Sequence, residues 1–174
     1  IKPDITTLGK SLSNGFVISA VGGKNEIMEQ LSPNGNVYEA STFAGNPIST
    51  RAAIASLHTM YSLKNKIYPK LAKQCLSLTK SIRESATKYG IEHQVNTISS
   101  MFQIFFTDKP VTDYTSSKLA DGKKFHKLFS GLLNEGIFIA PSQFETGFLS
   151  YAHTDSDLEK TMHSYDYALR QIRT

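Results

Sequence analysis

Apolar side chains recur every three or four residues in several stretches of this 174-residue chain. The clearest stretch runs from residue 65 to residue 89 and is followed at once by Gly90. Its apolar positions are Ile67, Leu71, Cys75, Leu78 and Ile82. This spacing predicts one long amphipathic helix, and Gly90 predicts its end because glycine readily adopts the left-handed backbone that closes helices.

Four further helices are predicted by their starting residues and periodicity. Asn25 begins a short one that Pro33 stops, and Asn46-Pro47 begins another that reaches about Tyr61 and packs on a sheet. Apolar residues at 125, 128, 129, 132 and 133 mark one that Gly136 ends. Thr154 and Asp157 have the spacing of a capping box before the last stripe. That stripe contains Leu158, Met162, Tyr165, Leu169 and Ile172.

Short β-branched or aromatic runs predict the strands. The predicted strands are residues 15–21, 91–95, 101–107 and 137–139, and 148–152 is a further candidate. The first of them is predicted to be buried. Residues 109–122 are polar and predict a loop. The part after Gly90 therefore indicates a compact α+β unit whose strands are covered by two helices. The first 45 residues lack enough helices and strands to close a core of their own.

Composition narrows the possible functions. With 40% apolar and 20% charged residues, a packed core is expected. The net charge of +4 comes largely from seven Lys or Arg residues between 64 and 88 that face only Glu84, which indicates a solvated helix face and not a nucleic-acid site. No apolar run approaches the roughly 20 residues that span a bilayer. The single cysteine, Cys75, and the lack of a secretory segment favour a cytoplasmic protein.

Two segments near the start could carry chemistry. Lys10 follows Gly9 and has some apolar neighbours in sequence. It could be a reactive lysine, although a lysine is nucleophilic only when deprotonated. The alternative is a surface lysine without a chemical role. Ser41 and Thr42 precede the helix start at Asn46-Pro47, where hydroxyls and free N–H groups suit a phosphate. The alternative there is ordinary loop and capping chemistry.

Two other features concern charged and metal-binding side chains. Glu145 lies between apolar residues and could orient a substrate amine, although such a carboxylate is more often an exposed loop residue. The five histidines, at 58, 93, 126, 153 and 163, have no metal-ligand spacing, so no metal site is expected.

Taken in order, several segments resemble the class III pyridoxal-phosphate-dependent aminotransferases and, among them, the glutamate-1-semialdehyde aminomutases. The matching segments, which extend over essentially the whole chain, are 4–10 (DITTLGK), 21–28 (VGGKNEIM), 33–47 (PNGNVYEASTFAGNP), 144–145 (FE) and 148–154 (FLSYAHT). Two departures stand out: 15–20 reads GFVISA where the family has Gly-x-Pro-x-Gly-Ala, and Ser41 replaces a common glycine.

The resemblance implies a fold and a set of roles. The fold would be the α/β fold type I of aspartate aminotransferase-like enzymes, with 1–63 as the end of the large cofactor-binding domain, 64–89 as a connecting helix and 90–174 as the small C-terminal α+β domain. Lys10 would hold pyridoxal 5′-phosphate as a Schiff base and transfer the proton. Thr42 would bind the cofactor phosphate across a homodimer interface, and Glu145 would face the substrate.

The implied reaction exchanges the amino and oxo groups of glutamate 1-semialdehyde to give 5-aminolevulinate for tetrapyrrole (porphyrin) synthesis. Because the family's ring-stacking and phosphate-loop residues precede the lysine, we expect residues 1–174 to be the C-terminal portion of the enzyme and inactive alone. Two alternatives remain: another class III ω-aminotransferase, or a non-catalytic packing or dimerisation fragment.

Overall fold

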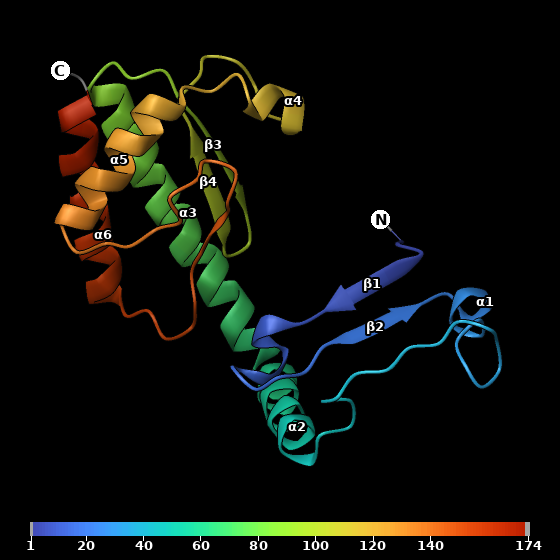
Figure 1. The fold of residues 1–174 in the computed structure, drawn as a ribbon. Coiled ribbons are helices and arrows are strands. Elements are labelled where there is room, and N and C mark those ends of the chain that lie inside the picture. Colours follow the sequence, from blue (N-terminus) through green and yellow to red (C-terminus); the bar gives the residue numbers. More distant parts are fainter. Residues whose placement is uncertain (1, 173–174) are drawn as a thin grey trace. The chain divides into compact units, whose positions relative to one another are not determined.

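The computed structural model describes residues 2–172 and divides into two compact units, Ile1–Lys64 and Asn65–Thr174. Figure 1 shows the chain coloured from its N-terminus to its C-terminus. No helix within the described residues is both long and apolar enough to cross a membrane.

The first unit is built from short elements and one longer helix. In chain order these are β1 (Ile5–Leu8), the 3-10 helix η1 (Lys10–Ser13), β2 (Ala20–Gly23), α1 (Asn25–Met28) and α2 (Pro47–Ser62).

Strands β1 and β2 form an antiparallel hairpin in which Ile5 pairs with Gly23 and Leu8 with Ala20. The prediction of a buried strand at 15–21 is wrong, because pairing starts only at Ala20 and every residue of both strands is exposed. Asn14 and Gly15 have φ angles of 52° and 106°, so the chain turns there instead of extending. A Cβ on Gly23 in β2 would lie 2.6 Å from the backbone oxygen of Asp4, so this close approach requires glycine.

The predicted helix start at Asn46-Pro47 is confirmed. The Asn46 side chain accepts hydrogen bonds from the backbone N–H groups of Ile48 and Ser49, each at 3.1 Å. Within the described residues the helix it starts, α2, packs on η1, and its predicted packing on a sheet stays a prediction. Asn25 lies inside α1, whose cap position is Lys24, so its predicted capping role is wrong.

The first unit buries very little. Within residues 2–64, Ala53 is the single buried apolar side chain, and Ser13 and Ser49 are the buried polar ones. Phe16, Val17, Ile54 and several other large apolar side chains are half or more exposed. The expectation that the first 45 residues cannot close a core is confirmed for the described part of the chain.

Within the described residues, the second unit combines one sheet with four helices. In chain order its elements are α3 (Lys64–Lys88), β3 (Gln94–Ile98), β4 (Met101–Phe105), α4 (Tyr114–Ser117), α5 (Gly122–Asn134), β5 (Gly147–Phe148) and α6 (Asp155–Ile172).

The sheet has the order β3-β4-β5, and both pairs are antiparallel. The strand predicted at 91–95 begins later, because the N–H of Ile91 bonds to the carbonyl of Ala86 and closes α3. The strand predicted at 137–139 is absent from the described structure, since the N–H of Ile137 bonds back to Leu132 at the end of α5. Of the candidate at 148–152, only Phe148 lies in a strand, as the last residue of β5.

Three helices cover one face of this sheet, where the sequence predicted two. Figure 1 shows α3, α5 and α6 side by side on that face. Their buried stripes meet the inward residues of β3 and β4 in one core of 20 buried apolar side chains. At the crossing of α5 and α6, a Cβ on Gly131 would lie 2.9 Å from that of Ala168, so the glycine permits the close approach.

Polar caps set the limits of the shorter helices. Thr154 and Asp157 bond reciprocally, which confirms the predicted capping box of α6. The side-chain hydrogen bond from Thr154 to its carboxylate lowers the pKa of Asp157. The predicted loop at 109–122 contains the additional helix α4, which Asp113 caps at Ser116.

Candidate functional site

Lys10, the candidate reactive lysine, lies at the start of η1, directly after Gly9. Its φ angle is +55°, a left-handed conformation that costs a non-glycine residue about 1–2 kcal/mol. Such unfavourable backbone angles cluster at functional sites, because the surrounding structure must impose them. The Lys10 side chain is exposed within the described residues of the first unit.

Lys10 lines a cleft of about 430 Å³ together with the segments 16–19 and 43–45 and the side chains of Glu39 and Ser41. This size is within the range of small-molecule sites. Both departures from the family pattern, at 15–20 and at Ser41, contribute residues to this cleft. The departures from the family pattern therefore lie in the walls around Lys10.

Thr42 belongs to the turn between Ser41 and Gly45 and is exposed. Its neighbours Ser41 and Phe43 line the Lys10 cleft. The fold thus brings the segment of Thr42 to the same cleft as Lys10, although Thr42 follows Lys10 by 32 positions in the sequence. The role of Thr42 toward a phosphate stays a prediction.

The start of α2 offers fewer free donors than the sequence suggested. Asn46 already accepts from the N–H groups of Ile48 and Ser49, and Pro47 has no N–H. A phosphate at this end of the cleft would therefore depend on hydroxyls and N–H groups of the 41–45 turn, and not on the helix terminus.

Glu39 is a cleft residue that the sequence analysis did not single out. It precedes Thr42 by three positions in an irregular segment, where no periodicity distinguishes a cleft side chain from a solvated one. A carboxylate in this cleft attracts an ammonium group and repels a phosphate. Glu39 therefore gives the Lys10 cleft a negative part as well as a positive one.

Glu145, the candidate substrate-side residue, belongs to the second unit and is exposed. Its N–H bonds to the carbonyl of Ser142 in the turn before β5. Because Lys10 and Glu145 lie in different units, the role of Glu145 at the lysine site stays a prediction.

No group of three or more His, Cys, Asp or Glu side chains capable of holding a metal ion occurs within residues 2–172. The cleft instead offers an amine, the hydroxyls of Ser19 and Ser41, and apolar walls from Phe16, Val17 and Ile18. These groups have the chemistry that pyridoxal phosphate requires. Its aldehyde binds an amine, its ring needs apolar contacts, and its phosphate needs hydrogen-bond donors.

Sequence comparison identifies the class. Residues 1–164 match the model of the family Aminotransferase class-III, and the chain belongs to this family. Over 173 residues it is 62% identical to glutamate-1-semialdehyde 2,1-aminomutase of Nitrosopumilus maritimus (strain SCM1) and 50% identical to glutamate-1-semialdehyde 2,1-aminomutase 1 of Cenarchaeum symbiosum (strain A). Each match covers 99% of this chain and 41% of the relative, so the chain spans about two fifths of their length.

Solved structures agree on the fold. An omega-transaminase from Sphaerobacter thermophilus superimposes with a TM-score of 0.82 at 25% identity, over 99% of this chain and 39% of that one. A glutamate-1-semialdehyde aminomutase from Pseudomonas aeruginosa PAO1, solved in complex with PMP, gives 0.78 at 19% identity over the same shares. The predicted fold class, part of an aspartate aminotransferase-like transferase, is confirmed.

Proposed function

We propose that this chain is the C-terminal portion of an enzyme that converts glutamate 1-semialdehyde to 5-aminolevulinate by moving the amino group within the molecule. The observation that carries this proposal is the 62% identity to an aminomutase along 99% of the chain. The product would enter tetrapyrrole synthesis. The left-handed Lys10 in a cleft of suitable size supports the proposal from the structural side.

When bound, pyridoxal 5′-phosphate supplies an aldehyde that reacts with amines and a ring that withdraws electrons from the adjacent carbon. Lys10 holds the group through its Nζ atom. The Lys10 amine, when free, would accept a proton from one carbon of the substrate and return it to another, since a neutral amine can act first as base and then as acid. Thr42 holds the phosphate through its hydroxyl, and Glu145 faces the substrate.

The remaining features of the proposal concern assembly and domains. Thr42 acts on the cofactor of the neighbouring subunit of a homodimer, and the enzyme is cytoplasmic. Residues 1–63 are the end of the large cofactor-binding domain, 64–89 the connecting helix and 90–174 the small domain. The described structure supports the position of the first boundary, because the first unit ends at Lys64.

Substitution of Lys10 tests the catalytic assignment. In the enzyme that contains this chain, Lys10→Ala is expected to lower kcat by at least about 10²- to 10⁴-fold, the usual contribution of a positioned acid–base group. Borohydride reduction of the wild-type enzyme followed by peptide mapping should place the pyridoxyl label on the Lys10 peptide. The matched control is Lys24→Ala, which removes an exposed lysine of the same unit that is paired with Asp4 at 2.6 Å.

The control should retain both turnover and label. A pyridoxyl label on any other peptide, or full activity of Lys10→Ala, contradicts the assignment. An assay with glutamate 1-semialdehyde as the sole substrate separates the two candidate reactions, because an ω-aminotransferase requires an added amino acceptor and an aminomutase does not.

A further inference from the structure

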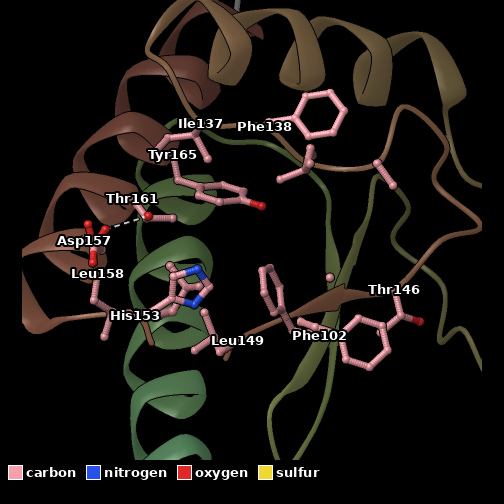
Figure 2. Close-up of a pocket in the computed structure, with 15 residues that line it drawn as sticks. Phe102, Ile137, Phe138, Thr146, Leu149, His153, Asp157, Leu158, Thr161 and Tyr165 are labelled. Carbon is pink, nitrogen blue, oxygen red and sulfur yellow. Dashed lines mark hydrogen bonds between the residues drawn. The ribbon is translucent and has the colours of Figure 1, made fainter. Parts of the chain in front are cut away.

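The second unit contains a separate pocket of about 240 Å³ that no step of the proposed reaction uses. It opens between α6, strands β4 and β5, and the segment 137–140 (Figure 2). Its walls are mainly apolar. They include Phe102 and Leu149 from the sheet side and Leu158 from α6.

A buried hydroxyl points into this pocket. Tyr165 is 2% exposed, and Figure 2 shows its ring entering from α6 with the oxygen directed toward the centre of the pocket. Within residues 2–172 the Tyr165 hydroxyl makes no hydrogen bond to the protein, and burial raises the pKa of this phenol, so it keeps its proton. The hydroxyl can therefore donate a hydrogen bond to a molecule held in the pocket.

His153 offers a second donor to the same space. Its Nδ1 atom accepts a hydrogen bond from the N–H of Ser150 at 3.0 Å. In the neutral imidazole this leaves the proton on Nε2. Figure 2 shows the His153 ring at the side of the pocket below Tyr165. Both polar groups can therefore donate to one acceptor.

The charge of the walls selects against anions. No Lys or Arg lines the pocket, whereas the carboxylate of Asp157 does. The hydrogen bond from the Thr154 hydroxyl lowers the pKa of Asp157, so this carboxylate remains negative near neutral pH. A carboxylate or phosphate on a ligand would meet like charge and no counter-ion.

We propose that this pocket binds a small neutral molecule that has an apolar body the size of a benzene ring and one hydrogen-bond acceptor, such as an aryl ester or ketone. An apolar cavity of about 150 Å³ accommodates benzene, so about 240 Å³ leaves room for the substituent that carries the acceptor. The acceptor receives the bonds of Tyr165 and His153, and the ring contacts Phe102, Leu149 and Leu158.

Methyl-detected NMR titration of the 174-residue chain tests this proposal with methyl benzoate as the probe. The methyl signals of Leu149 and Leu158 should shift and saturate with a dissociation constant of roughly 1 mM, which corresponds to a low binding energy per atom. Benzoate, with the same ring and a negative charge, should bind at least 10-fold more weakly. Unchanged pocket signals with methyl benzoate overturn the proposal.

Tyr165→Phe removes only the donor. It should weaken methyl benzoate about fivefold, the value of one ordinary hydrogen bond, and leave sec-butylbenzene, an isostere without an acceptor, unaffected. The variant should unfold in urea like the wild type, because the lost hydroxyl has no protein partner within residues 2–172. Tyr89→Phe is the matched control, since that phenol bonds to Asp166 and does not line the pocket.

Methyl benzoate should bind this control as it binds the wild type. If Tyr165→Phe binds methyl benzoate as tightly as the wild type does, or if Tyr89→Phe weakens it equally, the pocket does not recognise an acceptor and the proposal is wrong. The outcome is independent of Lys10, because the titration measures binding in the second unit and requires no turnover.

Discussion

The two units of this chain differ in what they bury. The second packs 20 apolar side chains into one core, whereas within residues 2–64 only Ala53 among the apolar residues is buried. Yet the first unit contains the candidate reactive lysine and the three longest segments that resemble the family, 4–10, 21–28 and 33–47. The residues proposed for chemistry therefore lie in the unit that is less able to stabilise itself.

This contrast follows from chain order and element type. Long periodic helices in the second unit pack on a neighbouring sheet, so burial is achieved by residues close in sequence. The first unit has a two-stranded hairpin with both faces exposed, and such hairpins are marginal without further packing. Its exposed apolar side chains, among them Phe16, Ile54 and Leu57, indicate that its stability depends on contacts beyond its own residues.

Separating the units should have the largest effect. Residues 65–174 alone are expected to unfold in one cooperative transition with a free energy typical of a small domain, roughly 5–15 kcal/mol. Residues 1–64 alone should show no cooperative transition, because their buried apolar surface cannot offset the entropy of ordering the backbone. Urea unfolding followed by circular dichroism and amide exchange measures both. A cooperative transition in residues 1–64 would abolish the contrast.

A pair of leucines compares the two units directly. Leu128 on α5 is 0% exposed, and Leu128→Ala should lower the free energy of unfolding by about 2–5 kcal/mol through lost burial and a residual cavity. Leu57→Ala on α2, where the side chain is 50% exposed, should change it by less than about 0.5 kcal/mol. Urea midpoints of the 174-residue chain give both values, and equal losses would contradict the assignment of the core.

A smaller effect concerns the polar link between α3 and α6. Partial burial would raise the pKa of Asp166, but hydrogen bonds from Ser85 at 2.8 Å, Tyr89 at 2.9 Å and Lys88 at 3.4 Å outweigh it and lower the pKa. Stability from a carboxylate with a lowered pKa is present above its unfolded value of about 3.9 and is lost as pH falls through the folded value.

Asp166→Asn should therefore cost about 1 kcal/mol at pH 7, a modest figure because the side chain is 37% exposed and solvent screens it. The difference between variant and wild type should shrink as the pH is lowered from 5 to 3. Urea unfolding at several pH values measures it. A difference that is constant across this range would show that the charge of Asp166 contributes nothing.

The sequence predicted helices better than strands, for a physical reason. The stripes of α3, α5 and α6 and the caps at Asn46 and Thr154 are local signals, and the structure confirms them. Strands at 91–95 and 137–139 were placed by residue type alone. There the backbone N–H groups of Ile91 and Ile137 instead bond to carbonyls at the ends of the preceding helices. Residue type alone does not predict this, because strand formation depends on tertiary context.

The candidate site was predictable only in part. The segments of Lys10 and Thr42 were singled out by their residue types, and the family resemblance supplied their predicted roles. The fold brings both segments to one cleft. Glu39 was missed because nothing in an irregular segment marks which side chains face a cleft. Tyr165 was predicted as one position of an apolar stripe, which is correct for its ring but does not reveal that its hydroxyl faces a pocket.

The left-handed backbone at Lys10 has an evolutionary consequence. Glycine would adopt that conformation with less strain than lysine does, so at this position the residue that best suits the fold would have no amine. Mutations that increase stability would then favour glycine at position 10, whereas the proposed chemistry requires lysine there. Under the proposed function, selection for the Lys10 amine would have to offset this conformational disadvantage.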